Sequence, residues 1–273
     1  MKTAALLALS VLFNSAISNA ATYASPEARQ IIDKVVAAHG GMERWNRAKT
    51  LGFTHILTFG PPLAAEWGIS EEVTDIQTLR TYQWWPLDGA LLGSDGAKTW
   101  TKNWRGFSFP NMNANQFYRA LSMPWSIASQ PYAVGEPSTG KLVKDSIEYI
   151  TIRINFDPKT GESAKRYYRL FVDPQSYRIK AVEYSVTYGA FLDLINLPKD
   201  QTFFGPMTHI YYEYAEVDGL IFPKKYDTFG EDGARQGSHV VYNYSLAMPF
   251  DESKMKMPAD AVIDTSNRAR KSQ

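Results

Sequence analysis

From position 50 onward the sequence repeats a single pattern, in which a short strand-forming segment is followed by a turn. Within SIEYITIRINF (146–156), apolar side chains stand at every second position, with polar or larger ones between them. Because successive side chains of a strand point to opposite faces, this alternation predicts a strand with one buried face. Comparable segments flank DPQS (173–176) and Asp218-Gly219, and the second of these is a strong hairpin signal. The pattern therefore predicts many sequential antiparallel strands.

Two segments with helical spacing accompany these strands. In SPEARQIIDKVVAAHGG (25–41), Ser25 is suited to cap a helix, Pro26 fits its first position, and the final glycine pair ends it. A second helix is predicted over 114–123, where apolar residues recur at helical spacing.

A long meander of strands twists and curls, and its apolar concave face has to be covered. We therefore predict an α+β fold, a strongly curved antiparallel sheet that forms an incomplete β-barrel. The N-terminal and central helices would cover its concave face. Residues 21–273 contain no linker rich in glycine, serine or proline, so a single domain is expected over this range.

The first twenty residues, MKTAALLALSVLFNSAISNA, have the organisation of a secretory signal peptide. One lysine precedes an apolar run over 4–13, which is too short to span a bilayer, and small residues follow at Ser18 and Ala20. We expect cleavage after Ala20 and a periplasmic location for residues 21–273.

The charge balance and the missing motifs exclude several classes of function. The chain has 29 basic and 28 acidic residues, which argues against nucleic acid as a partner, and it has no cysteine for thiol chemistry. No G-x-S-x-G, HExxH or glycine-rich phosphate loop occurs. We therefore predict a non-enzymatic protein without cofactor or metal.

The histidines leave one catalytic alternative open. His209 and Glu213 would share a strand face by their spacing, and with His239 they could form the zinc site of a metal-dependent hydrolase. The simpler interpretation places these three as polar residues on the solvent side of the sheet. His39 and His55 are isolated in the sequence and are expected to be packed or surface histidines.

Six of the seven tryptophans fall within residues 67–125. Such a cluster either builds an ordinary core or lines an apolar cavity. Trp84 and Trp85 are neighbours and must point to opposite faces of a strand, whereas Tyr82 shares the face of Trp84. A lipid chain buried against these rings would gain about 0.8 kcal/mol per methylene group.

Four segments carry a resemblance to a known family: HGGMERW (39–45), GSDGAKTW (93–100), VDPQSYRIKAVEY (172–184) and YYEYAEVDGLIFPKKYDTFGEDG (211–233). In these the chain resembles the periplasmic lipoprotein carriers of Gram-negative bacteria and the wider group of outer-membrane lipoprotein-sorting proteins. The resemblance implies a half-open barrel lidded by helices, with an apolar cavity for acyl chains and no catalytic residues.

We therefore predict a carrier or binding protein for a lipid, a lipoprotein acyl chain or another apolar ligand. Trp100 is the strongest single candidate for a cavity-lining residue, because it follows the Asp95-Gly96 turn of the family-like segment. The predicted ligand-binding residues are Ile31, Ile32, Val35, Tyr82, Trp84, Trp100, Phe117, Leu121 and Trp125.

The alternative to a carrier is a lipid-sensing or protein-interaction module of the cell envelope. The apolar segment GAFLDLINLP (189–198) would then touch a membrane or an envelope protein through Phe191, Leu192, Leu194 and Ile195. The same segment could equally be a short helix packed into the core.

Overall fold

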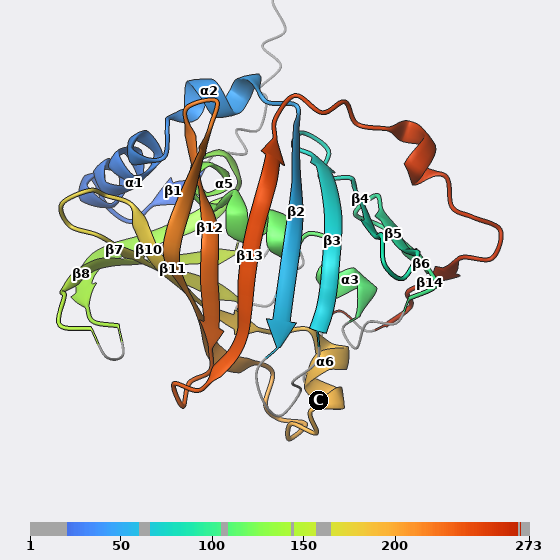
Figure 1. Ribbon diagram of the computed structural model, residues 1–273. Helices are drawn as coiled ribbons and strands as arrows, with labels where there is room; N and C mark the ends of the chain where they lie inside the picture. Colours follow the sequence, from blue (N-terminus) through green and yellow to red (C-terminus); the bar gives the residue numbers. More distant parts are fainter. Residues whose placement is uncertain are drawn as a thin grey trace, which may run out of the picture.

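The computed structural model describes residues 21–59, 66–104, 109–142, 145–156, 165–266 and 268. The predicted signal peptide, residues 1–20, lies outside these ranges. Fourteen strands of the described chain form one sheet (Figure 1). In spatial order they are β1 (Thr22–Tyr23), β7 (Tyr132–Gly140), β8 (Tyr149–Phe156), β9 (Tyr167–Val172), β10 (Ile179–Val186), β11 (Phe204–Val217), β12 (Leu220–Phe229), β13 (Arg235–Ser245), β2 (Thr50–Phe59), β3 (Glu66–Asp75), β4 (Thr81–Trp85), β5 (Ala90–Ser94), β6 (Thr99–Lys102) and β14 (Val262–Ile263).

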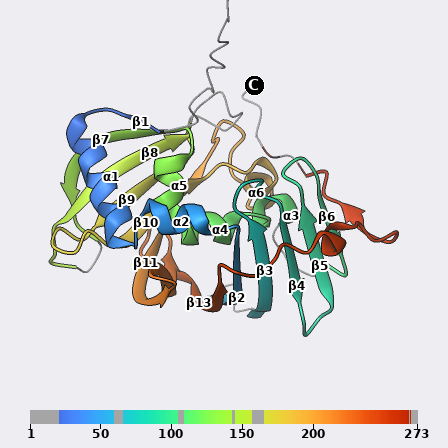
Figure 2. The same cartoon turned by 90° about the horizontal axis from the view of Figure 1, so that it is seen from above.

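Chain order and spatial order coincide over most of the sheet. Neighbours follow in sequence from β7 to β13 and again from β2 to β6, and the two runs join where β13 pairs with β2. Every pairing is antiparallel except that of β1 with β7. The sheet curves strongly without closing, and the N-terminal and central helices lie inside the curve (Figure 2). The predicted fold class is confirmed.

The first helix forms as its sequence predicts. In α1 (Pro26–Ala38), the Ser25 hydroxyl accepts a hydrogen bond from the Ala28 N–H at 3.2 Å, and proline opens the first turn. The short helix α2 (Met42–Arg47) follows directly and buries Trp45. Within the described part of the chain, no helix is both long and apolar enough to cross a membrane.

The central helical segment differs from the single helix predicted over 114–123. It consists of α3 (Pro110–Asn113), α4 (Gln116–Leu121) and α5 (Met123–Ser129). Ser122 ends α4 and also precedes α5. Pro124 explains the break, because proline is tolerated in the first turn of a helix but not in its interior.

The hydrophobic core occupies the space between α1, the central helices and the concave face of the sheet. At its centre the Trp125 ring stacks on Trp45 with centroids 4.7 Å apart, and Phe222 of β12 lies 5.0 Å from it. Six of the predicted ligand-binding residues belong to this core: Ile31, Ile32, Val35, Phe117, Leu121 and Trp125.

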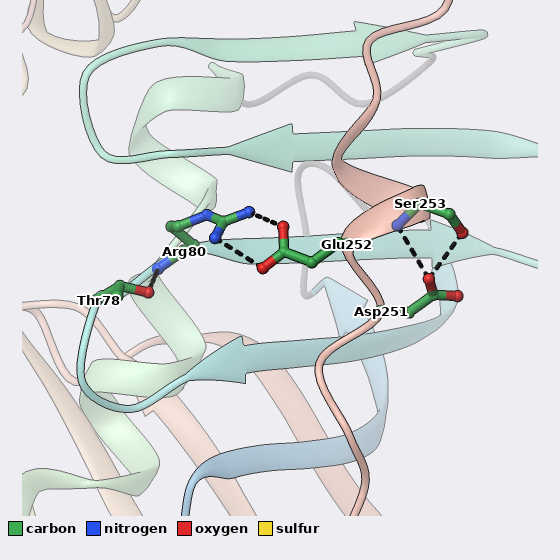
Figure 3. Close-up of polar contacts among 5 residues, drawn as sticks. All are labelled: Thr78, Arg80, Asp251, Glu252 and Ser253. Carbon is green, nitrogen blue, oxygen red and sulfur yellow. Dashed lines mark hydrogen bonds and ion pairs between the residues drawn. The ribbon is translucent and has the colours of Figure 1, made fainter.

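The C-terminal segment covers the outer face of β4 and β5. The short 3-10 helix η2 (Glu252–Met255) is anchored there by an ion pair between Glu252 and Arg80 (Figure 3). Phe250 packs on Tyr82 with ring centroids 5.2 Å apart, and the Lys254 ammonium lies 3.9 Å from the centre of the Trp84 ring. The protein's own chain therefore covers two aromatic residues that the sequence analysis assigned to a ligand.

Gly40 joins the end of α1 to the β11–β12 hairpin. Its φ is +103°, and a Cβ at this position would lie 2.1 Å from the Gly219 carbonyl oxygen. The Ile221 N–H donates to the neighbouring His39 carbonyl at 3.0 Å, so the two backbones are held together. We expect Gly40→Ala to lower the free energy of unfolding by about 2 kcal/mol or more, measured by urea denaturation.

Gly41 provides a matched control for this substitution. It also has a positive φ, +86°, but a Cβ there would meet nothing within 4 Å. With ψ at 159°, Gly41 lies in a backbone region that is almost restricted to glycine, so Gly41→Ala should show the backbone strain alone, about 1 to 3 kcal/mol. Gly40→Ala should cost more than this, because the clash with the Gly219 carbonyl is added. Equal losses for the two variants would contradict the close approach at Gly40.

Candidate ligand-binding cavity

A cavity of about 340 Å³ lies between the concave face of the sheet and the central helices. Strand β10 and the residues after it supply one wall, and α3, α4 and the two residues between them supply the facing wall. The ends of β5 and β6 contribute Ser94 and Thr99, whose hydroxyls are hydrogen-bonded at 2.9 Å. His209 of β11 also lines the cavity. A cavity of this size lies within the range of small-molecule sites.

The lining has an apolar part that would suit a hydrocarbon chain. Its members come from both walls and from the loop before β4, so a ligand would be enclosed between sheet and helices. They are Leu79, Met112, Ala114, Ala120, Met123, Val182 and Val186.

The rest of the lining is polar and carries positive charge. Arg119 of α4, Arg166 and Arg268 all line the cavity, and the lining contains no aspartate or glutamate among the described residues. Arg268 donates to Asn111 Oδ1 at 2.9 Å and to two backbone carbonyls, and the Arg166 guanidinium lies 4.4 Å from the Phe156 ring centre. Arginine forks match the geometry of carboxylate and phosphate, so this lining favours an anionic group.

None of the nine predicted ligand-binding residues lines this cavity. The six from the helices fill the core instead. Tyr82, Trp84 and Trp100 lie on the outer face, because Tyr82 pairs with Gly93 and Gly93 pairs with Trp100 across adjacent strands. The inner face of β4 carries Gln83, whose amide donates to the Ala114 carbonyl at 3.0 Å. Contact of a ligand with any of these nine residues therefore stays a prediction.

The segment predicted to touch a membrane or partner forms a helix, α6 (Gly189–Leu194). Leu194 and Ile195 are exposed, whereas Leu192 is fully buried and the Phe191 ring lies 5.9 Å from Phe204. Only part of the predicted apolar surface is therefore accessible, since a helix distributes successive side chains around its axis.

Three histidines form a buried hydrogen-bonded chain behind the cavity. His209 Nδ1 lies 2.8 Å from Thr228 Oγ1, which lies 2.9 Å from His239 Nε2. His239 Nδ1 lies 3.0 Å from His55 Nε2. All three side chains are buried on the concave side, so the interpretation of His209 and His239 as solvent-facing was wrong. The alternation of side chains along a strand does not show which of its two faces lies on the concave side of the sheet.

Burial keeps His209 and His239 neutral. Desolvation lowers the pKa of His209 to about 3 and that of His239 well below its ordinary value, and in both cases nearby His55 adds to the effect. Desolvation also lowers the pKa of His39 to about 4.

The predicted zinc triad does not assemble. The ladder of β11 with β12 is irregular on both sides of Glu213, and this turns Glu213 toward solvent, where Lys224 and Lys225 lie within 4.0 Å of its carboxylate. In the described ranges no group of three or more histidine or acidic side chains could hold a metal ion.

An open, strongly curved sheet with helices and a cavity inside its curve defines the architectural class of this protein. No protein-family model matches the sequence, and no curated protein matches it. Among solved structures, a DUF1329 family protein from Desulfovibrio piger matches with a TM-score of 0.51 and 10% identity, over 84% of this chain and 97% of that chain.

Two further solved structures cover the same 84% of this chain and 97% of their own, each at 10% identity. One is a LolA superfamily protein from Nitrosomonas europaea with a TM-score of 0.49. The other is described as an outer membrane lipoprotein-sorting protein domain from Vibrio parahaemolyticus and has a TM-score of 0.46. The Desulfovibrio piger structure, with its TM-score of 0.51, supports the curved-sheet fold that was expected from the sequence.

Proposed function

We propose that this chain is an exported, non-enzymatic binding protein for an amphipathic anion, such as a fatty acid or another lipid with one accessible acyl chain. The observation that carries the proposal is the composition of the cavity lining, which combines seven aliphatic side chains with three arginines. The predicted signal peptide supports export to the periplasm.

The energetics favour such a ligand. Burial of about ten methylene groups at about 0.8 kcal/mol each gives about 8 kcal/mol, against which the costs of association must be set. A carboxylate held by arginine adds about 1.5 to 3 kcal/mol, which corresponds to a factor of ten or more in affinity. The acyl chain would therefore supply affinity, and the arginines would select the charged headgroup.

Titration calorimetry with dodecanoate and dodecanol tests this proposal. We expect one dodecanoate to bind per chain, and dodecanol to bind at least about tenfold more weakly because it lacks the charge. Absence of dodecanoate binding, or equal affinity for the two compounds, would refute the proposed function.

Filling the cavity should weaken binding. Ala120 of α4 lines the cavity, and a phenyl ring at this position would occupy the space of several methylene groups. Ala120→Phe is therefore expected to weaken dodecanoate binding by about tenfold or more, since each excluded methylene group removes about 0.8 kcal/mol. Ala37 lies exposed on α1, so Ala37→Phe is the matched control and should bind as the wild type does.

A further inference from the structure

The lining of the cavity changes from buried to exposed along β10. Val182 and its partner on β11, His209, are 1% and 6% exposed, and Val186 is 9% exposed. Tyr188, just beyond β10, is half-buried and Arg268 is exposed, so we call this end of the cavity the mouth. Between Val182 and Val186 the strand extends about 13 Å. A charged headgroup keeps more of its hydration at the mouth, whereas an acyl chain gains most from the buried end.

The C-terminal segment connects the two walls of the cavity at the mouth. After β14, which pairs with β6, the Asp264 carboxylate accepts hydrogen bonds from the backbone N–H of Asn111 at 2.7 Å and from that of Ser266 at 2.8 Å. Asn111 lies in α3, on one wall. The Ser266 hydroxyl lies 2.6 Å from the hydroxyl of Tyr188, on the other wall. Both oxygens of the Asp264 carboxylate thus hold the segment in place.

Arg268, the last described residue of this segment, is held by neutral groups. Its guanidinium donates to the carbonyls of Gly96 at 3.2 Å and Ala97 at 3.3 Å, and to Asn111 Oδ1 at 2.9 Å. A guanidinium carries five N–H donors, so these three hydrogen bonds leave others for a ligand. Within the described ranges, no carboxylate forms an ion pair with Arg268. The fold therefore positions this positive charge without neutralising it.

We propose that Arg268 binds the anionic headgroup of the ligand at the mouth, and that the acyl chain extends inward along β10 past Val186 toward Val182. This assignment rests on the proposed function and names the residue that selects the charge. Because three hydrogen bonds already hold the guanidinium, binding an anion costs little further rotamer freedom. Asp264 is a positioning residue, since it fixes the segment that carries Arg268 but does not line the cavity.

Titration calorimetry of Arg268→Gln with dodecanoate and dodecanol tests the assignment. Glutamine removes the charge, so the preference for dodecanoate should fall by about threefold or more, while dodecanol binds as it does to the wild type. Arg29→Gln removes the same charge from an exposed position on α1 and should keep the full preference. A full preference in Arg268→Gln, or an equal loss for both compounds, would overturn the assignment.

Asp264→Ala tests the positioning role with the same two compounds. Removal of a negative charge would by itself strengthen anion binding, so a lower preference for dodecanoate in this variant points to the displaced guanidinium. We expect the preference to fall as it does in Arg268→Gln, and the double variant to fall no further. An unchanged preference in Asp264→Ala would overturn the positioning role.

The wild-type protein separates two kinds of failure. If it binds dodecanoate no better than dodecanol, the proposed function fails and the assignment of Arg268 fails with it. If the wild type prefers dodecanoate and Arg268→Gln prefers it equally, the proposed function stands and the assignment of the headgroup to Arg268 is wrong.

Discussion

Lowering the pH from 7 to 5 is expected to reduce the free energy of unfolding by about 6 kcal/mol. His39, His209 and His239 have folded-state pKa values of about 4, about 3 and well below the ordinary value, because burial disfavours their charged forms. In the unfolded chain each titrates near 6.5. Their contribution is therefore fully present above about pH 6.5 and is lost as the pH falls toward the folded-state values.

The size of this effect follows from the number of histidines. Each one that must stay neutral in the folded state loses about 2 kcal/mol between pH 7 and pH 5, and the carboxylates change little in this window. Urea denaturation at pH 7, 6 and 5 measures the loss. His39→Gln should reduce the pH dependence by roughly a third, since one of three titrating groups is removed. A midpoint that does not change between pH 7 and pH 5 would contradict the burial of these side chains in neutral form.

Trp125→Ala is expected to destabilise the protein by about 3 to 5 kcal/mol. Trp125 is fully buried between Trp45 and Phe222, at the point where the central helices meet the sheet. Alanine would leave a large void, because the surrounding helices and strands can collapse only in part. Chemical denaturation at pH 7 measures the loss.

Two matched variants separate packing from other effects at this position. Trp125 Nε1 has no hydrogen-bond partner among the described residues, so Trp125→Phe sacrifices no polar contact and should cost much less. Trp84 is partly exposed on the outer face, where Trp84→Ala should cost about 1 kcal/mol. A loss for Trp125→Ala that is no larger than the loss for Trp84→Ala would contradict the central position of Trp125.

The sequence was sufficient to predict the strands, most turns and the first helix, because alternation, capping and turn chemistry are local properties. The Asp218-Gly219 hairpin between β11 and β12 is an example. The residues of the cavity could not be predicted in the same way. Alternation separates Tyr82 and Trp84 from Gln83, but only the tertiary structure shows that the C-terminal segment covers the first two.

The hydrogen-bonded chain of histidines could not be predicted from the sequence for a related reason. His55 and His239 are 184 positions apart and meet because β2 pairs with β13. No local sequence pattern predicts that pairing. Period-two spacing also failed at Glu213, where the irregular ladder changes the side-chain direction. In α4 the apolar face holding Phe117 packs into the core, and Arg119 on another face lines the cavity. The residues predicted to bind a ligand were mostly the most apolar ones, and in the structure such residues of α4 pack in the core.

Photocrosslinking with a diazirine-bearing dodecanoic acid tests most directly whether the cavity is the ligand site. After irradiation and proteolysis, mass spectrometry should place the label on peptides that contain α4 or β10, with less of it in Ala120→Phe. Labelling concentrated on residues 31–35, 82–84 or 100, or distributed evenly over the chain, would show that the ligand does not occupy the space between the central helices and β10.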